Sequence, residues 1–264
     1  MARKIISEYG QAVFNLPWLV AQEEGLFAEE GLEVEFVRGR ERDPQLAAET
    51  NPQQVHPFWR HAPFEERAAQ VFNACEWGQI RRSDESRVNG RIVSMRPAVV
   101  SQGIFVRPDS PISHPQELRN KTVAVNFHAG SHYLALQMLE GFMDREEIKV
   151  VHLGQARVRY RAMMDGEVDA AALMEPYIAL AEKAGCNLIM EAHYAGSEMA
   201  SPDLDDETFA AINRAVTRAV KLINAHEFGN GTAIFTHRYS LEDAAQAYQL
   251  FDTQTTGKGV FLFD

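Results

Sequence analysis

The stretch Cys75-Glu76-Trp77 places a thiol, a carboxylate and an indole side by side, directly after an apolar run that is typical of a strand. A thiol is a nucleophile when neighbouring cations lower its pKa, and a carboxylate can deliver a proton to a reacting carbon. The indole of Trp77 can stack on an aromatic ligand or pack in the core. Arg81 and Arg82 follow, as partners of Glu76 or in exposed ion pairs of small energy.

We expect the strand to continue through Glu76, so that Cys75 and Glu76 point to opposite faces. A free thiol is easily buried, whereas an ionised carboxylate is costly to bury without a partner. The sequence therefore predicts that Glu76 faces the site and acts in function while Cys75 mainly packs. A thiol nucleophile at Cys75 stays open as the alternative.

Residues 38–66 are the least patterned part of the chain, and such loop-like insertions often carry function. His56 and His61 in this segment can act as general acid or base near neutral pH. Arg40 stands between two further arginines at alternate positions, so on an extended segment the three would project to one side and suit a dianionic ligand. A solvated loop face is the alternative for Arg40.

Two loops that follow expected strands can contact a ligand. Tyr9, Gln11 and Asn15 lead from the first strand into a helix, and their alternative role is only a capped helix start. In the second loop, Gly130 lets the backbone turn and Ser131 can cap the helix that follows. The N–H groups at that helix start would bind an acid group.

His128 and His132 are four residues apart, a spacing that can hold a metal ion when both lie on one helix. However, His128 is expected to precede the helix, and a third ligand is not evident. We therefore predict that His128 contacts an anionic ligand and that there is no metal site. The segment Arg157–Arg161 is expected to form an exposed helix face.

The 264 residues include 45% hydrophobic and 24% charged residues, as in an ordinary globular protein of one large or two small domains. A net charge of −11 argues against general binding of nucleic acid or anionic membranes. We expect no membrane insertion, no secretory signal and hence a cytoplasmic protein with free thiols at Cys75 and Cys186. No glycine-rich dinucleotide fingerprint or cysteine zinc cluster occurs, so we expect no cofactor.

Strand and helix signals alternate along the chain, which is typical of an α/β fold with parallel sheets. Expected strands lie near residue 5, at 32–37 and 71–76, and within 90–112, 117–127, 148–154, 168–174 and 187–193. Expected helices lie at 16–24, from about 131, within 159–166, after 176 and at 205–227.

This pattern resembles the NMT1/Thi5-like branch of the type II periplasmic solute-binding-protein superfamily. The similar stretches are VAQEEGLFAEEGLEVEFV at 20–37, GIFVRPDSPISHPQELRNKTVAV at 103–125 and MMDGEVDAAALMEPY at 163–177. The resemblance implies a two-lobed α/β fold with a ligand cleft between the lobes. It also implies that Glu175, at a strand end, lines that cleft.

The same resemblance divides the chain into a discontinuous first lobe, residues 1–100 and 193–264, and a second lobe, residues 101–192. VFNACEWGQIRRS at 71–83 is similar to 4,5-dihydroxyphthalate decarboxylase, and QGIFVRPDSPI at 102–112 to aromatic sulfinate desulfinase. The loop at 9–15 lacks the cysteine that the desulfinase carries there. The tail at 236–264 looks instead like that of medium-chain alcohol dehydrogenases, and we expect a helix and a terminal strand.

These similarities favour a cytoplasmic lyase, of decarboxylase type, that acts on a small organic acid, with an aromatic acid as the favoured class. The alternative is a non-catalytic binding protein, the substrate-binding component of an ABC transporter or a sensor. A third possibility is a pyrimidine-precursor role, although the cysteine-rich iron motif of the Thi5 branch is absent. All three take a small anionic organic ligand, and none fixes the oligomeric state.

Overall fold

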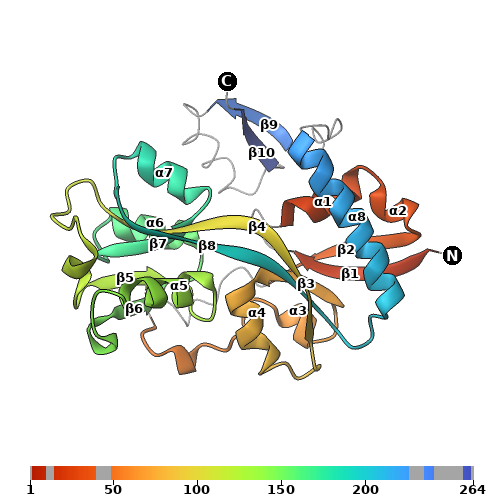
Figure 1. The fold of residues 1–264 in the computed structure, drawn as a ribbon, viewed down its shortest axis with the longest axis horizontal. Coiled ribbons are helices and arrows are strands. Elements are labelled where there is room, and N and C mark those ends of the chain that lie inside the picture. Colours follow the sequence, from red (N-terminus) through yellow and green to blue (C-terminus); the bar gives the residue numbers. More distant parts are fainter. Residues whose placement is uncertain (1, 10–14, 40–48, 226–234, 241–257, 263–264) are drawn as a thin grey trace. The chain divides into compact units, whose positions relative to one another are not determined.

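The computed structural model describes residues 2–9, 15–39, 49–225, 235–240 and 258–262. The chain divides into two compact units (Figure 1). One consists of Met1–Ser7, Asn15–Phe36 and Asp203–Asp264, and the other of Glu8–Phe14 and Val37–Pro202. The lobe limits expected from the resemblance stay a prediction.

The first unit packs helices beside two neighbouring strands. These elements are β1 (Arg3–Tyr9, whose end enters the second unit), α1 (Leu16–Glu23), α2 (Leu26–Glu29), β2 (Leu32–Arg38) and α8 (Asp206–Ala225). Trp18 of α1 is fully buried, and its ring lies 5.5 Å from that of Phe27. Apolar residues recur along one face of α8, as expected for a helix that packs on a core. β9 (Phe235–Ser240) and β10 (Lys258–Leu262) form a separate parallel pair.

A mixed sheet organises the second unit, with strand order β3-β8-β4-β7-β5-β6. Its strands are β3 (Val71–Cys75), β4 (Arg91–Val106), β5 (Thr122–Val125), β6 (Lys149–His152), β7 (Ala170–Met174) and β8 (Asn187–Ala200). β5 runs parallel to β6 and β7, as predicted, while β4 is antiparallel to β7 and β8 and β3 is antiparallel to β8. The helices are α3 (Ala62–Glu65), α4 (Glu76–Ser83), α5 (Gly130–Leu139), α6 (Ala156–Met164) and α7 (Tyr177–Lys183). Short 3₁₀ helices are η3 (Pro52–Gln54), η4 (Pro115–Leu118) and η5 (Arg145–Glu147).

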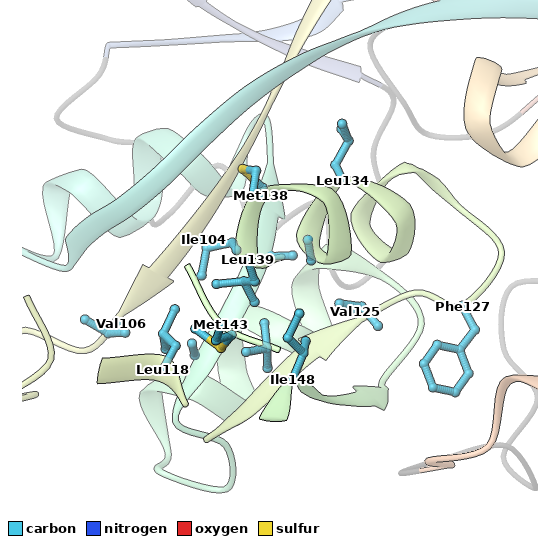
Figure 2. Close-up of a cluster of buried hydrophobic side chains, with 14 of the residues drawn as sticks. Ile104, Val106, Leu118, Val125, Phe127, Leu134, Met138, Leu139, Met143 and Ile148 are labelled. Carbon is cyan, nitrogen blue, oxygen red and sulfur yellow. The ribbon is translucent and has the colours of Figure 1, made fainter. Parts of the chain in front are cut away.

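Alternate residues of the sheet build two cores. Val123 and Val125 of β5 join a cluster that includes Leu134 and Leu139 of α5 (Figure 2). Ala124, between them in sequence, joins the opposite cluster. Because side chains of a strand point alternately to its two faces, helices can cover both faces of this part of the sheet.

The α/β class and most predicted elements are confirmed. α1 begins after Asn15 as expected, with Pro17 in its first turn, but the Asn15 side chain makes no capping hydrogen bond. β2 shows the expected alternation of buried and exposed residues at its start. The predicted strand of the C-terminal tail is β10, whereas the helix expected there falls outside the described residues.

Candidate functional site

The carboxyl ends of β3 and β7 point toward each other along the long strand β8. Cys75, the last residue of β3, is paired with Gly196 of β8, and Met174, the last residue of β7, reaches Ala192 of β8 through Gln102 of β4. Four residues of an extended strand span about 13 Å. Ligands of α/β proteins commonly bind at carboxyl ends of strands, so this convergence marks the candidate site.

The turn after β3 differs from the sequence prediction. β3 ends at Cys75, and Glu76 is the first residue of α4 rather than a strand residue. The prediction that Cys75 and Glu76 alternate across one strand was therefore wrong, because the backbone turns into a helix between them. Cys75 is buried in the core, as the packing hypothesis requires, and Glu76 is half-buried.

The turn after β5 also corrects two expectations. The left-handed residue is His128, with φ of 60°, and Gly130 is instead the first residue of α5. Ser131 lies inside the helix, and its hydroxyl accepts a hydrogen bond from the backbone N–H of Asn126 at 2.9 Å. It therefore ties the helix back to the end of β5, whereas the N-cap residue is Ala129 without a side-chain cap.

The N-termini of α4 and α5 meet at Cys75. The backbone N–H of Gly130 donates to Cys75 Sγ at 3.0 Å, across 55 residues of sequence. We call this place the strand-end junction and define it by residues 75–82, residues 126–133 and Tyr194. Tyr194 belongs to the junction because it lies on β8 between the two converging strand ends, and its hydroxyl contacts Met174 Sδ at 3.7 Å.

Arg82 brings a buried positive charge to the strand-end junction. Its side chain is only 4% exposed, which contradicts the expectation of an exposed ion pair. Helical side chains lean toward the helix N-terminus, and accordingly the guanidinium of Arg82 lies against Gly78, one turn earlier in α4. Nε donates to the carbonyl of Pro57 at 2.9 Å, and Nη1 has no hydrogen-bond partner. No carboxylate within the described part of the chain forms an ion pair with Arg82.

Arg81, in contrast, is partly exposed and pairs with Glu85 one turn later, as expected for a surface ion pair. It also raises the positive potential at the junction, since it contributes to lowering the pKa of His128.

His128 links two segments through its ring. Nε2 lies 2.8 Å from the carbonyl of Pro52, which can only accept, so Nε2 carries the proton and donates. Nδ1 is then free to accept from the hydroxyl of Tyr133, 3.3 Å away. The rings of Trp77 and Tyr133 lie 6.2 Å apart at a small interplanar angle, so Trp77 packs on a residue of the junction.

Two further histidines are held neutral next to this loop. His132 Nδ1 accepts from the backbone N–H of His128, and His152 Nδ1 accepts from that of Phe127. Burial lowers the pKa of His132 to about 3 and that of His152 to about 4. At neutral pH neither ring carries charge, which leaves the arginines as the cations of this region.

The candidate catalytic groups have shifted pKa values. Burial raises the pKa of the Cys75 thiol, which keeps the thiol protonated at neutral pH and disfavours a thiolate nucleophile. Burial also raises the pKa of Glu76, against hydrogen bonds from backbone N–H groups that favour its charged form. Oε2 of Glu76 is buried without a partner, so this carboxylate can interact with a ligand. Its role stays a prediction.

His61 and His56 lie in different surroundings. His61 Nδ1 is 2.7 Å from Oε1 of Glu8, and burial lowers the pKa of His61 to about 4 although Glu8 opposes the shift. Arg82 contributes to the same lowering, which places His61 within its electrostatic reach. His56 is exposed, and its Nδ1 accepts from the backbone N–H of Phe58.

The remaining predicted site residues are spread over the chain. Glu175 is exposed, directly after β7 and before α7, and the backbone N–H of Ala179 donates to it at 3.4 Å. Asn15 is fully buried at the start of α1 in the first unit. Gln11, Arg40 and the side chain of Tyr9 lie outside the described residues.

Sequence reasoning did not identify Arg82, Tyr133 and Tyr194 as residues of the junction, and it did not predict that Arg159 is buried. Arg159 is buried rather than exposed, and its Nε donates to the carbonyl of Ala172 at 2.7 Å. A usable signal existed for Arg82, because a glycine four residues earlier in a helix that starts at a strand end lets an arginine lie back toward the helix N-terminus. Tyr194 gave no such signal, since its position follows only from the strand register.

No group of three or more histidine, cysteine, aspartate or glutamate side chains within the described ranges can hold a metal ion. Among the helices of these ranges, none is long and apolar enough to cross a membrane. The cytoplasmic location expected from the sequence stays a prediction.

Comparison with known proteins assigns the fold. The family model NMT1/THI5 like matches residues 98–226, in agreement with the resemblance found in the sequence. No curated protein matches the chain by sequence. The alkanesulfonate-binding protein SsuA from Xanthomonas axonopodis pv. citri, bound to MOPS, superimposes with a TM-score of 0.67 and 17% identity, over 93% of this chain and 81% of that one.

Two further structures agree. The periplasmic aliphatic sulphonate-binding protein SsuA from Escherichia coli gives a TM-score of 0.66 at 17% identity, over 87% of this chain and 77% of that chain. A Candida albicans protein with the generic periplasmic binding protein fold gives a TM-score of 0.64 at 14% identity, over 94% of this chain and 80% of that chain. The chain thus has the periplasmic-binding-protein fold, as predicted, whereas similarity to a decarboxylase is not shown.

Proposed function

We propose, from the periplasmic-binding-protein fold, that this chain is a solute-binding protein that takes a small organic anion at the strand-end junction. The observation that carries the proposal is the guanidinium of Arg82, which is buried and has an unpartnered Nη1 beside the N-termini of α4 and α5. The transporter-component or sensor reading is thereby favoured over the lyase.

The physical argument begins with the cost of a buried charge. A guanidinium taken out of water without a counter-charge costs several kcal/mol, as an order of magnitude, so a buried arginine is normally paired. Here the partial positive charge of a helix N-terminus increases the cost, and the charge of Glu8 offsets it only in part, without an ion pair to Arg82. An acid group bound at the junction would pair with Arg82 and would also be attracted by the partial positive charge of the helix N-termini.

The ligand class follows from the same groups. Arg82 Nη1 is an unpartnered donor, which suits the oxygens of a sulfonate, carboxylate or phosphonate. The two SsuA proteins of similar fold bind sulfonates by name, which supports sulfonates as the first class to test. The overall charge of −11 does not oppose this, because a local guanidinium decides the potential at a buried site.

The lyase hypothesis finds less support. A protonated thiol at Cys75 and a neutral His61 with a pKa of about 4 are weakly suited to nucleophilic or acid catalysis at neutral pH. The family match and the structural neighbours also favour binding over bond cleavage.

Calorimetric titration with MOPS, propane-1-sulfonate, benzoate and propan-1-amine tests the proposal. We expect the anions to bind, and the amine, which has no acid group, to give no heat of binding. Replacement of Arg82 by Gln should weaken anion binding about 10–100-fold, which corresponds to one charge-assisted hydrogen bond. Arg119→Gln is the control, because Arg119 is exposed in a surface pair with Glu147, 3.1 Å away.

Two outcomes would overturn the proposal. One is equal affinity of the anions for the Arg82→Gln variant and the parent chain. The other is release of carbon dioxide or sulfite from an aromatic carboxylate or sulfinate at a rate that scales with protein concentration, since that result restores the lyase.

A further inference from the structure

Gly78 lies in the first turn of α4, where a side chain would meet the groups of the strand-end junction. A Cβ atom built on Gly78 would collide with Arg82 Nη1 and would lie 3.1 Å from Arg82 Cζ and 2.9 Å from the carbonyl oxygen of His128. Cβ atoms do not approach other atoms so closely without a shift of the neighbour. The end of the Arg82 side chain is the group that can move, because the His128 oxygen belongs to the backbone.

The backbone itself does not require glycine here. Gly78 is not among the residues with positive φ, and it lies inside a regular helix. Alanine is the better helix former at such a position, whereas glycine has a larger entropic cost of ordering. The reason for glycine must therefore be the space beside its Cα atom.

Arg82 occupies that space because of helix geometry. Residues four apart lie one above the other, and the later side chain leans toward the N-terminus over the earlier one. With glycine at position 78 the guanidinium can lie flat on the first turn of α4 and stay 96% buried, since its exposed fraction is 4%. With any larger residue it must leave this place.

We propose that Gly78 is the positioning residue of the anion site, whose missing side chain holds Arg82 Nη1 at the N-terminal end of α4 for the bound acid group. This inference rests on the proposed function. It assigns to Gly78 no contact with the ligand and no acid–base role.

The first test is calorimetric titration of Gly78→Ala with propane-1-sulfonate. We expect affinity to fall about tenfold or more, since the charge-assisted hydrogen bond to Arg82 is lost. Gly141→Ala is the matched control, because a Cβ atom there has only the Met138 carbonyl nearby, at 3.6 Å. Its affinity should stay within about twofold of the parent. Unchanged affinity of Gly78→Ala, with binding by the parent chain, would overturn the inference and leave the proposed function intact.

The second test needs no ligand. Melting temperatures are measured for Gly78→Ala, Arg82→Met and the double variant. We expect Gly78→Ala to lower the melting temperature more when Arg82 is present than in the Arg82→Met background, where the collision with the guanidinium is gone and only the close approach to the His128 carbonyl remains. An equal decrease in both backgrounds would mean that Gly78 only makes room for the His128 carbonyl. Absence of any binding by the parent chain would instead refute the proposed function.

Discussion

At the scale of single residues, charge at the strand-end junction comes from arginine and not from histidine. Each histidine in the junction, and His152 next to it, has its tautomer fixed by a backbone group: His132 by the N–H of residue 128, His152 by the N–H of Phe127, and His128 by the Pro52 carbonyl. Burial lowers the pKa of all three. His132 and His152, with pKa values of about 3 and about 4, therefore add no positive charge at neutral pH.

These histidines make stability dependent on pH. A group with a folded-state pKa below its unfolded value binds more protons when unfolded, so stability is fully present above about pH 6.5 and is lost as pH falls toward the folded value. The folded-state pKa is about 4 for His61 and His152 and about 3 for His132. Between pH 6.5 and its folded-state pKa, each of these histidines should lower the free energy of unfolding by about 1.4 kcal/mol per pH unit.

Urea denaturation at pH 7.5, 6.0 and 5.0 measures this loss. We expect the free energy of unfolding to decrease less between pH 6.0 and 5.0 in the His132→Phe variant than in the parent. The difference should be about 1.4 kcal/mol, which corresponds to one proton fewer taken up on unfolding. His193→Gln, at an exposed position of β8, should keep the slope of the parent. A parent chain with equal stability at pH 7.5 and 5.0 would contradict the neutral, buried histidines.

At the scale of elements, residues 49–61 run past the ends of three strands and are held there by hydrogen bonds to their carbonyls. The His152 N–H donates to Glu49 at 2.7 Å, the His128 ring to Pro52 at 2.8 Å and Arg82 Nε to Pro57 at 2.9 Å. Two of these donors are junction side chains. An anion that fixes Arg82 should therefore also fix this segment.

Hydrogen exchange with and without propane-1-sulfonate tests that coupling. We expect the ligand to slow exchange in peptides that cover residues 51–61, because local opening must break the bond between Arg82 and Pro57. Peptides from α7, residues 177–183, serve as the reference and should not change. In the Arg82→Gln variant the ligand should have no effect, and a ligand effect that persists there would exclude Arg82 as the link.

Most helices and strands were predictable from the sequence, but the contacts between them at the strand-end junction were not. Periodicity located β2, α1 and α8 to within about two residues, because local burial patterns define them. The end of β3 was misplaced by one residue, and with it the orientation of Glu76, since nothing in Cys75-Glu76 marks a helix start by capping. The contact of Cys75 with Gly130 depends on sheet register over 55 residues, which no local pattern encodes.

At the scale of the whole molecule, an acidic chain holds arginine in its interior. The net charge is −11, yet both Arg82 and Arg159 are buried, and backbone carbonyls accept hydrogen bonds from each. Burial lowers the pKa of Arg159 to about 9. The net charge argued against binding of nucleic acid or anionic membranes. It could not indicate a cation in the interior, because net charge does not report where single charges lie.

Cys75 lies between the starts of α4 and α5, so the reactivity of its thiol reports how often these two helices separate. Both cysteines are free and buried, so a thiol-labelling reagent reaches each only during a transient opening. The labelling rate of Cys75 therefore measures how often α4 separates from α5. The labelling rate of Cys186 measures a different opening near Met164, whose Sδ lies 3.5 Å from Cys186 Sγ. Mass spectrometry of the two peptides should show that propane-1-sulfonate slows the first rate and leaves the second unchanged, whereas equal slowing would mean that the ligand acts on global unfolding.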